Sequence, residues 1–154
     1  MKLKKDDHII YIFKNKNNHL KHMFENKYLL TSIIFSNFNN SKITNMLDLF
    51  NNCPSLMSIN LSNSNTYKIT DMGFMFGGCN NLSKINVSRF DTNKTIEVEG
   101  MFVCCNSLNS INLANFNTNN AINMCYKFSS CNSLTSNDLS NFNTNNLTDM
   151  MYMF

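Results

Sequence analysis

Large apolar residues recur along this chain at a fixed 26-residue interval. The interval is clearest for the phenylalanines, which stand at Phe24, Phe50, Phe76, Phe102, Phe128 and Phe154. Two further series keep it, the cysteines at Cys53, Cys79, Cys105 and Cys131 and the leucines at Leu30, Leu56, Leu82, Leu108 and Leu134. A period of this size predicts a solenoid, because each unit is too small to bury its own apolar face and must stack on its neighbours.

The first half of each unit has the pattern of a short strand. In the unit of residues 101–128, Leu108, Ile111 and Leu113 form L-x-x-I-x-L. Ile111 and Leu113 stand two residues apart, so a strand directs both side chains to one side and the residues between them to the other. One such strand per unit predicts a single parallel sheet.

The second half of each unit has the spacing of a helix. Ala121, Met124 and Phe128 stand at i, i+3 and i+7, which is the spacing of one helical face. Thr118 precedes this face as a natural N-cap, and in the preceding unit Gly78 stands where a helix-ending, left-handed residue is expected. The sequence therefore predicts an α/β solenoid, a right-handed superhelix with one parallel sheet and short helices on the opposite face.

The N-terminal residues fit the repeat less well. Residues 1–23 are predicted to form an irregular capping unit, with a strand at Ile9–Phe13, because terminal repeats must turn one face to water. Residues 24–154 form an array of five 26-residue units. The array is expected to continue beyond Phe154 or to be truncated there.

Asparagine dominates the composition, at about one position in five, whereas there are only four glycines and one proline. Turns must therefore rely on Asn, Asp and Ser, which bond to their own main chain and tolerate a left-handed backbone. An asparagine-rich chain can also be prion-like and disordered. The regular spacing of the apolar residues favours a folded repeat.

The charge pattern argues against a nucleic-acid partner. The formal net charge is only +3, and basic residues gather near the N-terminus, at Lys2, Lys4, Lys5, Lys14, Lys16 and Lys21. A nucleic-acid binder usually carries a basic stripe along its repeats.

No apolar run approaches the ~18 residues of a membrane span. The run Ile9–Phe13 is also shorter than the ~7–15 residues of a secretory signal, so no signal peptide is predicted.

One unit carries a family resemblance. The motif C-x-S-L-x-x-I-x-L-x-N-F-N-T-x-N-x-T-D-M-x-x-M-F, nearly complete from Cys131 to Phe154, resembles the BspA-type leucine-rich repeats and related bacterial surface lipoprotein repeats. The resemblance implies a leucine-rich-repeat solenoid displayed on a cell surface, with adhesion or binding to host proteins as its function. The chain departs from the pattern at Ser64, which replaces the loop Phe, and at Asn137, which replaces the strand Ile. It also shows no secretion signal or lipid-attachment cysteine near the N-terminus.

The cysteine series does not have the geometry of a metal site. Equivalent residues in successive coils lie ~4.8 Å apart, whereas zinc holds four sulfurs at ~2.3 Å from one point. Disulfides between coils are also disfavoured, because parallel Cβ vectors stay at ~4.8 Å. The series is interpreted as buried, reduced thiols that act as small hydrophobes. Cys104 stands at a turn position and is expected to be the most accessible thiol.

No catalytic or cofactor site is predicted. His8, His19 and His22 all stand in the N-terminal unit. On a helix, His19 and His22 can share one face and bind a metal weakly, but no acidic or cysteine partner recurs at matching spacing. No glycine loop suited to phosphate appears, and the repeats lack the histidine that a Ser-His-Asp site requires. The chain is therefore not expected to be an enzyme or to hold a metal or cofactor.

The outer face of the sheet is the candidate binding surface. Its predicted residues are small, polar and nearly uncharged: Ser58, Asn60, Ser62, Lys84, Asn86, Ser88, Ser110, Asn112, Ser136 and Asp138. Solenoids use such extended faces for binding. The face lacks the Tyr, Trp and Arg that anchor tight interfaces, so a plain solvated sheet is the alternative interpretation.

The functional prediction is non-enzymatic binding or adhesion to a protein ligand, with a host or matrix protein as one possibility. The resemblance implies a cell-surface or secreted location. An intracellular scaffold is the alternative, since free cysteines suit a reducing cytosol.

End-to-end self-association is also expected, because the last coil exposes apolar residues, among them Leu134, Leu139, Phe142 and Met150.

Overall fold

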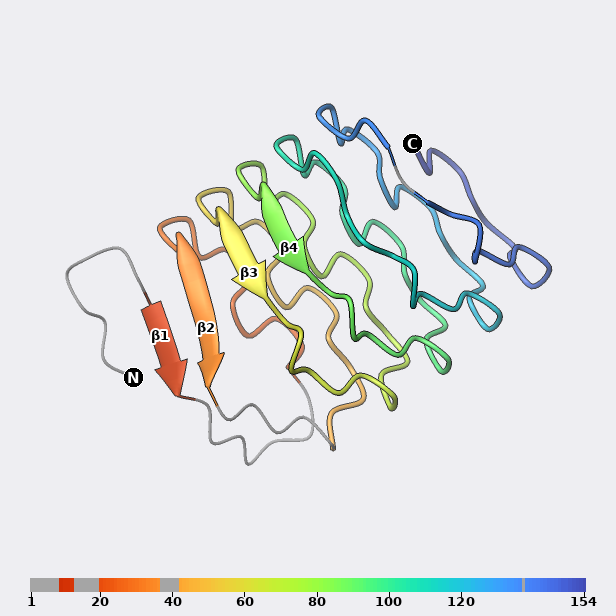
Figure 1. The fold of residues 1–154 in the computed structure, drawn as a ribbon, viewed down its shortest axis with the longest axis horizontal. Coiled ribbons are helices and arrows are strands. Elements are labelled where there is room, and N and C mark those ends of the chain that lie inside the picture. Colours follow the sequence, from red (N-terminus) through yellow and green to blue (C-terminus); the bar gives the residue numbers. More distant parts are fainter. Residues whose placement is uncertain (1–8, 13–19, 37–41, 137) are drawn as a thin grey trace.

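The chain forms a stack of similar coils that follow one another from the N-terminus to the C-terminus (Figure 1). The computed structural model describes residues 9–12, 20–36, 42–136 and 138–154. One parallel sheet runs along the stack in the order β1-β2-β3-β4, formed by β1 (Ile9–Ile12), β2 (Ser32–Ser36), β3 (Ser58–Asn60) and β4 (Lys84–Asn86). The predicted parallel sheet is therefore confirmed over these four strands, whereas the strand predicted around Ile111 is reduced to an isolated bridge between Ser110 and Ser136.

The sheet register reproduces the period of the sequence. Ile33 pairs with Ile59, and Ile59 pairs with Ile85, so the steps from β2 to β3 and from β3 to β4 each equal one repeat of the sequence. Ile33 and Ile59 are buried, as the alternation of apolar and polar residues predicts. β1 lies within the strand predicted at the N-terminus and pairs with β2. The wider capping role of residues 1–23 and the right-handed sense of the superhelix stay predictions.

A second line of parallel bridges joins the coils away from the strands. It links equivalent residues of five successive coils, Asn45, Asp71, Glu97, Asn123 and Asp149. These side chains also shape their own coils. Asp71 Oδ1 accepts a hydrogen bond from the N–H of Gly73 (3.0 Å), and Asp149 Oδ1 accepts one from Met151 (2.9 Å). These two carboxylates therefore close turns within their own coils.

The predicted helices do not form. Within the described residues the structure contains no helix, and consecutive tight turns occupy the segments of helical spacing. In residues 46–53, the N–H of Leu49 donates to the carbonyl of Met46 and that of Asn51 to Asp48, three residues back. The alternate N–H groups, at Asp48 and Phe50, donate to carbonyl oxygens of the next coil. An α-helix would use all these donors internally.

Left-handed residues explain why turns replace helix. Every described coil before the last has two residues of positive φ, four positions apart, such as Asp48 (φ 54) and Asn52 (φ 57). A left-handed residue ends an α-helix, so one at every fourth position leaves no room for a second helical turn. Gly78 (φ 70) is left-handed as predicted, but it lies in this turn series and does not terminate a helix. Asn, Asp and Gly are the residues that adopt this conformation most readily.

Threonines cross-link the coils where helix N-caps were expected. Thr118 is buried, and its Oγ1 donates to the carbonyl of Asn143 (2.9 Å) while accepting from the N–H of the same residue (2.7 Å). Thr66 with Asp91 and Thr92 with Asn117 form the same reciprocal pair. The N-cap interpretation of Thr118 was therefore wrong, because its hydroxyl bonds the next coil.

The phenylalanine series forms the centre of the core. Successive rings stack face to face at centroid separations of 5.3–5.8 Å, from Phe24 to Phe154. Phe50, Phe76 and Phe102 have no exposed surface. The inward residues Met46, Met72 and Met124 are buried as well. The phenylalanines from Phe24 to Phe128 therefore share one continuous core along the stack, whereas Met124 packs in a second cluster with Val98 and Ala121.

Three of the four cysteines in the series, Cys53, Cys79 and Cys105, are buried as predicted, and their thiols make a regular contact. The Sγ of Cys53, Cys79 and Cys105 donates to the carbonyl oxygen of the phenylalanine 29 residues earlier, at 3.0, 3.2 and 3.2 Å. All six cysteines are free thiols. Burial raises the pKa of Cys53 to about 11, so this thiol resists ionisation. Cys104 is half-buried, and Cys131, in the last coil, is half-buried too.

Candidate functional site

The predicted binding residues lie on the outer side of the sheet, opposite the buried isoleucines. The register aligns them across coils, because Ser58 pairs with Lys84, Asn60 with Asn86, and Ser110 bridges to Ser136. All ten are partly or fully exposed: Ser58, Asn60, Ser62, Lys84, Asn86, Ser88, Ser110, Asn112, Ser136 and Asp138. The strands β1 to β4 follow one another along one side of the stack (Figure 1).

The aligned asparagines of this face, Asn60, Asn86 and Asn112, stabilise the backbone. The Oδ1 atoms of Asn60, Asn86 and Asn112 accept hydrogen bonds from the backbone N–H two residues on, at 3.0, 3.2 and 3.0 Å. Asp138 makes the same contact with Ser140 at 2.9 Å. The hydrogen bonds from Ser140 also lower the pKa of Asp138. These side chains turn the chain at the end of the strand, which limits what they can offer a ligand.

Three other side chains of this face are uncommitted. Within the described residues, Lys84, Ser110 and Ser136 make no side-chain hydrogen bond or ion pair, and all are exposed. They occupy equivalent positions in successive coils: Lys84 lies in β4, and Ser110 bridges to Ser136 beyond the sheet. A partner on this face would therefore meet these three side chains first.

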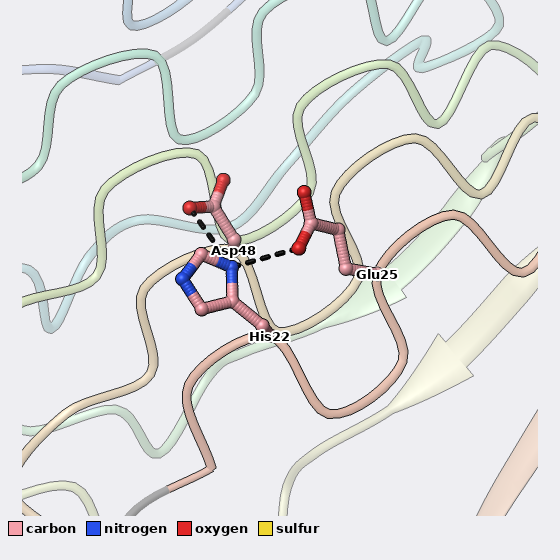
Figure 2. Close-up of side chains that lie close together, drawn as sticks. All are labelled: His22, Glu25 and Asp48. Carbon is pink, nitrogen blue, oxygen red and sulfur yellow. Dashed lines mark ion pairs between the residues drawn. The ribbon is translucent and has the colours of Figure 1, made fainter.

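A second candidate site lies in the turns of the first two coils. Figure 2 shows His22, Glu25 and Asp48 converging, with Nδ1 of the imidazole facing both carboxylates. Nδ1 lies 2.8 Å from Glu25 Oε2 and 3.4 Å from Asp48 Oδ2. The three ligand atoms lie within 4.8 Å of one another. The side chains are 45%, 30% and 15% exposed, respectively, so solvent reaches the cluster.

The repeat positions these three residues. His22 (φ 57) and Asp48 (φ 54) are equivalent left-handed residues of adjacent coils, 26 positions apart. The N–H of His22 donates to the carbonyl of Leu47 (3.0 Å), which joins the two turns directly. The N–H of Glu25 donates to the His22 carbonyl (3.3 Å) and closes the turn that returns its carboxylate to the imidazole. Two coils therefore contribute to one cluster.

Burial and nearby charges act in opposite directions on Asp48. The largest effect is desolvation, which raises the pKa of this carboxyl above its usual value. The imidazole of His22 lowers the pKa, whereas the negative charge of Glu25 raises it. The side chain of Asn51 and the charge of Lys21 also lower it. The net shift is upward, because desolvation together with the charge of Glu25 outweighs the groups that lower the pKa.

Sequence reasoning missed this cluster because it placed His22 on a helix with His19. His8 and His19 lie outside the described residues, as does Asn137, and the segment that contains His22 is a turn. The signal was the 26-residue interval itself, which puts Asp48 one coil beyond His22. Applying the interval to polar residues, as it was applied to Phe and Cys, would have brought the two together.

The fold defines the chain as a β-rich repeat protein whose 26-residue coils stack through parallel pairing and side-chain ladders. It belongs to the family described as "Mycoplasma protein of unknown function, DUF285", whose model matches residues 18–111 and again residues 83–154. Such overlapping matches are typical of a repeat. Searches of curated proteins and of solved structures gave no match. The narrower assignment to the BspA-type leucine-rich repeats stays a prediction.

The described part of the chain contains no helix with the length and apolar character needed to cross a membrane.

Proposed function

We propose that this chain is a non-enzymatic repeat protein that binds a protein partner through the outer face of its sheet. The main support is the register that aligns exposed polar side chains of successive coils into columns. A partner that spans several coils can use many weak, equivalent contacts at once, so its affinity rises through multivalency. Membership of a repeat family agrees with this function.

Exposed apolar side chains at the rim of the first coils support a protein partner. Tyr28 is 55% exposed, Leu29 87% and Met57 51%. Met57 lies beside the first coil, because its N–H donates to the carbonyl of Thr31 (2.9 Å). Tyrosine and methionine are enriched at protein interfaces. The rim can therefore supply apolar anchors that the sheet face lacks.

Cell-surface or secreted adhesion is the specific form of this function that the resemblance to BspA-type repeats favours. A host-surface or extracellular-matrix protein would then be the ligand. An intracellular interaction scaffold is the second candidate, and the six free thiols favour it. Observing whether the native protein lies outside or inside the cell, by protease accessibility on intact cells, separates the two.

The binding face can be tested with Lys84→Glu combined with Ser110→Arg. Both side chains are exposed and outside the hydrogen-bond network, so the fold should be preserved, with stability within about 0.5 kcal/mol of wild type. A partner identified by a screen against matrix and host-surface proteins, or by crosslinking in cells, should bind the double variant at least tenfold more weakly. Affinity is measured by surface plasmon resonance.

The control is Lys94→Glu, which makes the same charge change as Lys84→Glu alone, at an exposed residue away from the strands. It should leave binding unchanged. Equal affinity of wild type and the double variant for every partner would show that the outer face is a plain solvated sheet and would reject the proposal.

We also propose that the chain associates with itself through the face of the last coil. Met150 is 49% exposed and Phe154 71%, whereas the equivalent residues one coil earlier, Met124 and Phe128, are buried. The last coil therefore exposes the surface that each earlier coil buries against its neighbour. Sedimentation velocity should show concentration-dependent association that Met150→Asp with Phe154→Asp suppresses. A monomer at high concentration for wild type would contradict this.

A further inference from the structure

The cluster of His22, Glu25 and Asp48 has the composition of a metal site. One imidazole and two carboxylates supply nitrogen and oxygen donors, which suit zinc and related transition metals. The donors come from two turns held in register by the inter-coil hydrogen bond from His22 to Leu47, so they are prearranged by the backbone. Nothing in the proposed binding function requires them.

The distances fit a single bound ion. Tetrahedral zinc with bonds of about 2.0–2.1 Å keeps its ligand atoms about 3.3 Å apart. His22 Nδ1 lies 3.4 Å from Asp48 Oδ2 and 2.8 Å from Glu25 Oε2. The first distance already matches, and the second requires the flexible Glu25 side chain to move back by about half an ångström. All three donor atoms lie within 4.8 Å of one another, so side-chain adjustments can bring them around one ion.

The charge of the cluster favours a divalent cation. Nδ1 has at most one proton, so the imidazole can donate to only one of the two carboxylates at a time. With both carboxylates ionised, the cluster has a net charge of −2 when His22 is neutral and −1 when it is protonated. A divalent ion bound to the neutral imidazole balances both negative charges and interacts with all three side chains at once.

We propose that His22, Glu25 and Asp48 bind one divalent transition-metal ion through Nδ1 and one oxygen from each carboxylate. Three protein ligands leave one of four coordination positions open. Water can occupy this position, because the cluster is partly exposed. The ion would join the turn of residues 22–25 to the turn that contains Asp48. Metal binding should therefore stabilise the junction between the first two coils.

The proposal is tested by titrating zinc into the full chain after dialysis against a chelator. Calorimetry should show one ion per chain, and zinc should raise the melting temperature in a concentration-dependent way. His22→Asn, Glu25→Gln and Asp48→Asn should each weaken zinc binding at least tenfold and reduce the thermal shift. Their melting curves without zinc show whether each variant is folded, so a loss of binding can be separated from a loss of structure.

Two control variants test competing donors. Glu97→Gln removes a carboxylate from the acidic column Asp71–Glu97, and Cys104→Ser removes a half-buried thiol. Neither should change the affinity for zinc. Cobalt should give visible absorption typical of nitrogen and oxygen ligands, without the intense charge-transfer band of a thiolate.

Three results would overturn the assignment. One is unchanged zinc affinity in all three ligand variants, and the second is a thiolate band with cobalt that disappears in Cys104→Ser. The third is a loss of binding in His19→Asn while Glu25→Gln and Asp48→Asn bind normally, which would assign the ion to a histidine pair.

Discussion

Replacing Lys127 with methionine is expected to raise the melting temperature by roughly 10 °C, since about 3 kcal/mol shifts the transition of a chain of this size by that amount. The Lys127 side chain is completely buried and occupies a core position that is Met101 one coil earlier and Met153 one coil later. Its Nζ lies 3.9 Å from the sulfur of Met101. Methionine fills the same volume and has no charge to desolvate.

The protonation of Lys127 explains the size of this effect. Burial lowers the pKa of Lys127 from 10.5 to about 7. A shift of this size corresponds to about 4 kcal/mol of destabilisation at pH 7. Aromatic rings offset part of it, because Nζ lies 5.2–5.9 Å from the ring centroids of Phe102, Phe116, Phe128 and Phe142. Each ring face attracts the charged form, which brings the expected gain to about 3 kcal/mol.

The pH dependence gives a sharper test of the same lysine. The folded-state pKa lies below the unfolded value, so the unfolded chain binds more protons between about pH 7 and pH 10.5. Stability of the wild type should therefore rise with pH in this window, by up to about 1.4 kcal/mol per unit from this group. The advantage of Lys127→Met should be largest at or below pH 7 and smaller at pH 8.5, as measured by urea denaturation.

The matched control is Lys94→Met, which removes an exposed lysine. Its stability should stay within about 0.5 kcal/mol of wild type at both pH values. A stability difference between wild type and Lys127→Met that is the same at pH 6 and pH 8.5 would show that this lysine is not titrating in the core.

The sequence predicted the periodic core of this protein and failed on its turns. Apolar residues at a fixed interval must pack against their equivalents, so the buried positions and the parallel register could be predicted from Phe, Leu and Cys alone. The spacing of Ala121, Met124 and Phe128 fits successive tight turns as well as it fits a helix, because either structure places these three residues on one side of the chain. Which one forms depends on whether backbone N–H groups bond within the coil or to the next coil, and apolar spacing does not encode that choice.

The candidate sites show the same limit. The outer columns could be predicted, because strand alternation fixes which side chains leave the core. The link from His22 to Asp48 depends on left-handed residues at equivalent turn positions. Histidine is not a residue whose presence alone signals such a turn. The burial of Lys127 could not be predicted for a different reason, since a lysine in the sequence is normally interpreted as a surface residue.

Replacing Phe102 with alanine is expected to destabilise the fold by about 3–5 kcal/mol. Its ring has no exposed surface and stacks between Phe76 at 5.6 Å and Phe128 at 5.7 Å. Removing it leaves a cavity between two rings that neighbouring coils hold in place. Phe154→Ala is the matched control, because this ring has only one stacking partner and is 71% exposed. Its cost should stay below about 1 kcal/mol.

The Phe102 variant should also divide the stack into parts of unequal stability. Each coil contacts mainly its neighbours, so cooperativity passes from coil to coil through interfaces such as the phenylalanine stack. A cavity at Phe102 weakens one such interface, and the coils beyond it have fewer neighbours to support them. Hydrogen exchange should therefore become faster at the inter-coil amides of Tyr126 and Phe128 than at those of Asp48 and Phe50. Equal acceleration at all four amides would mean that the stack unfolds as a single unit and that the ring contributes no local coupling.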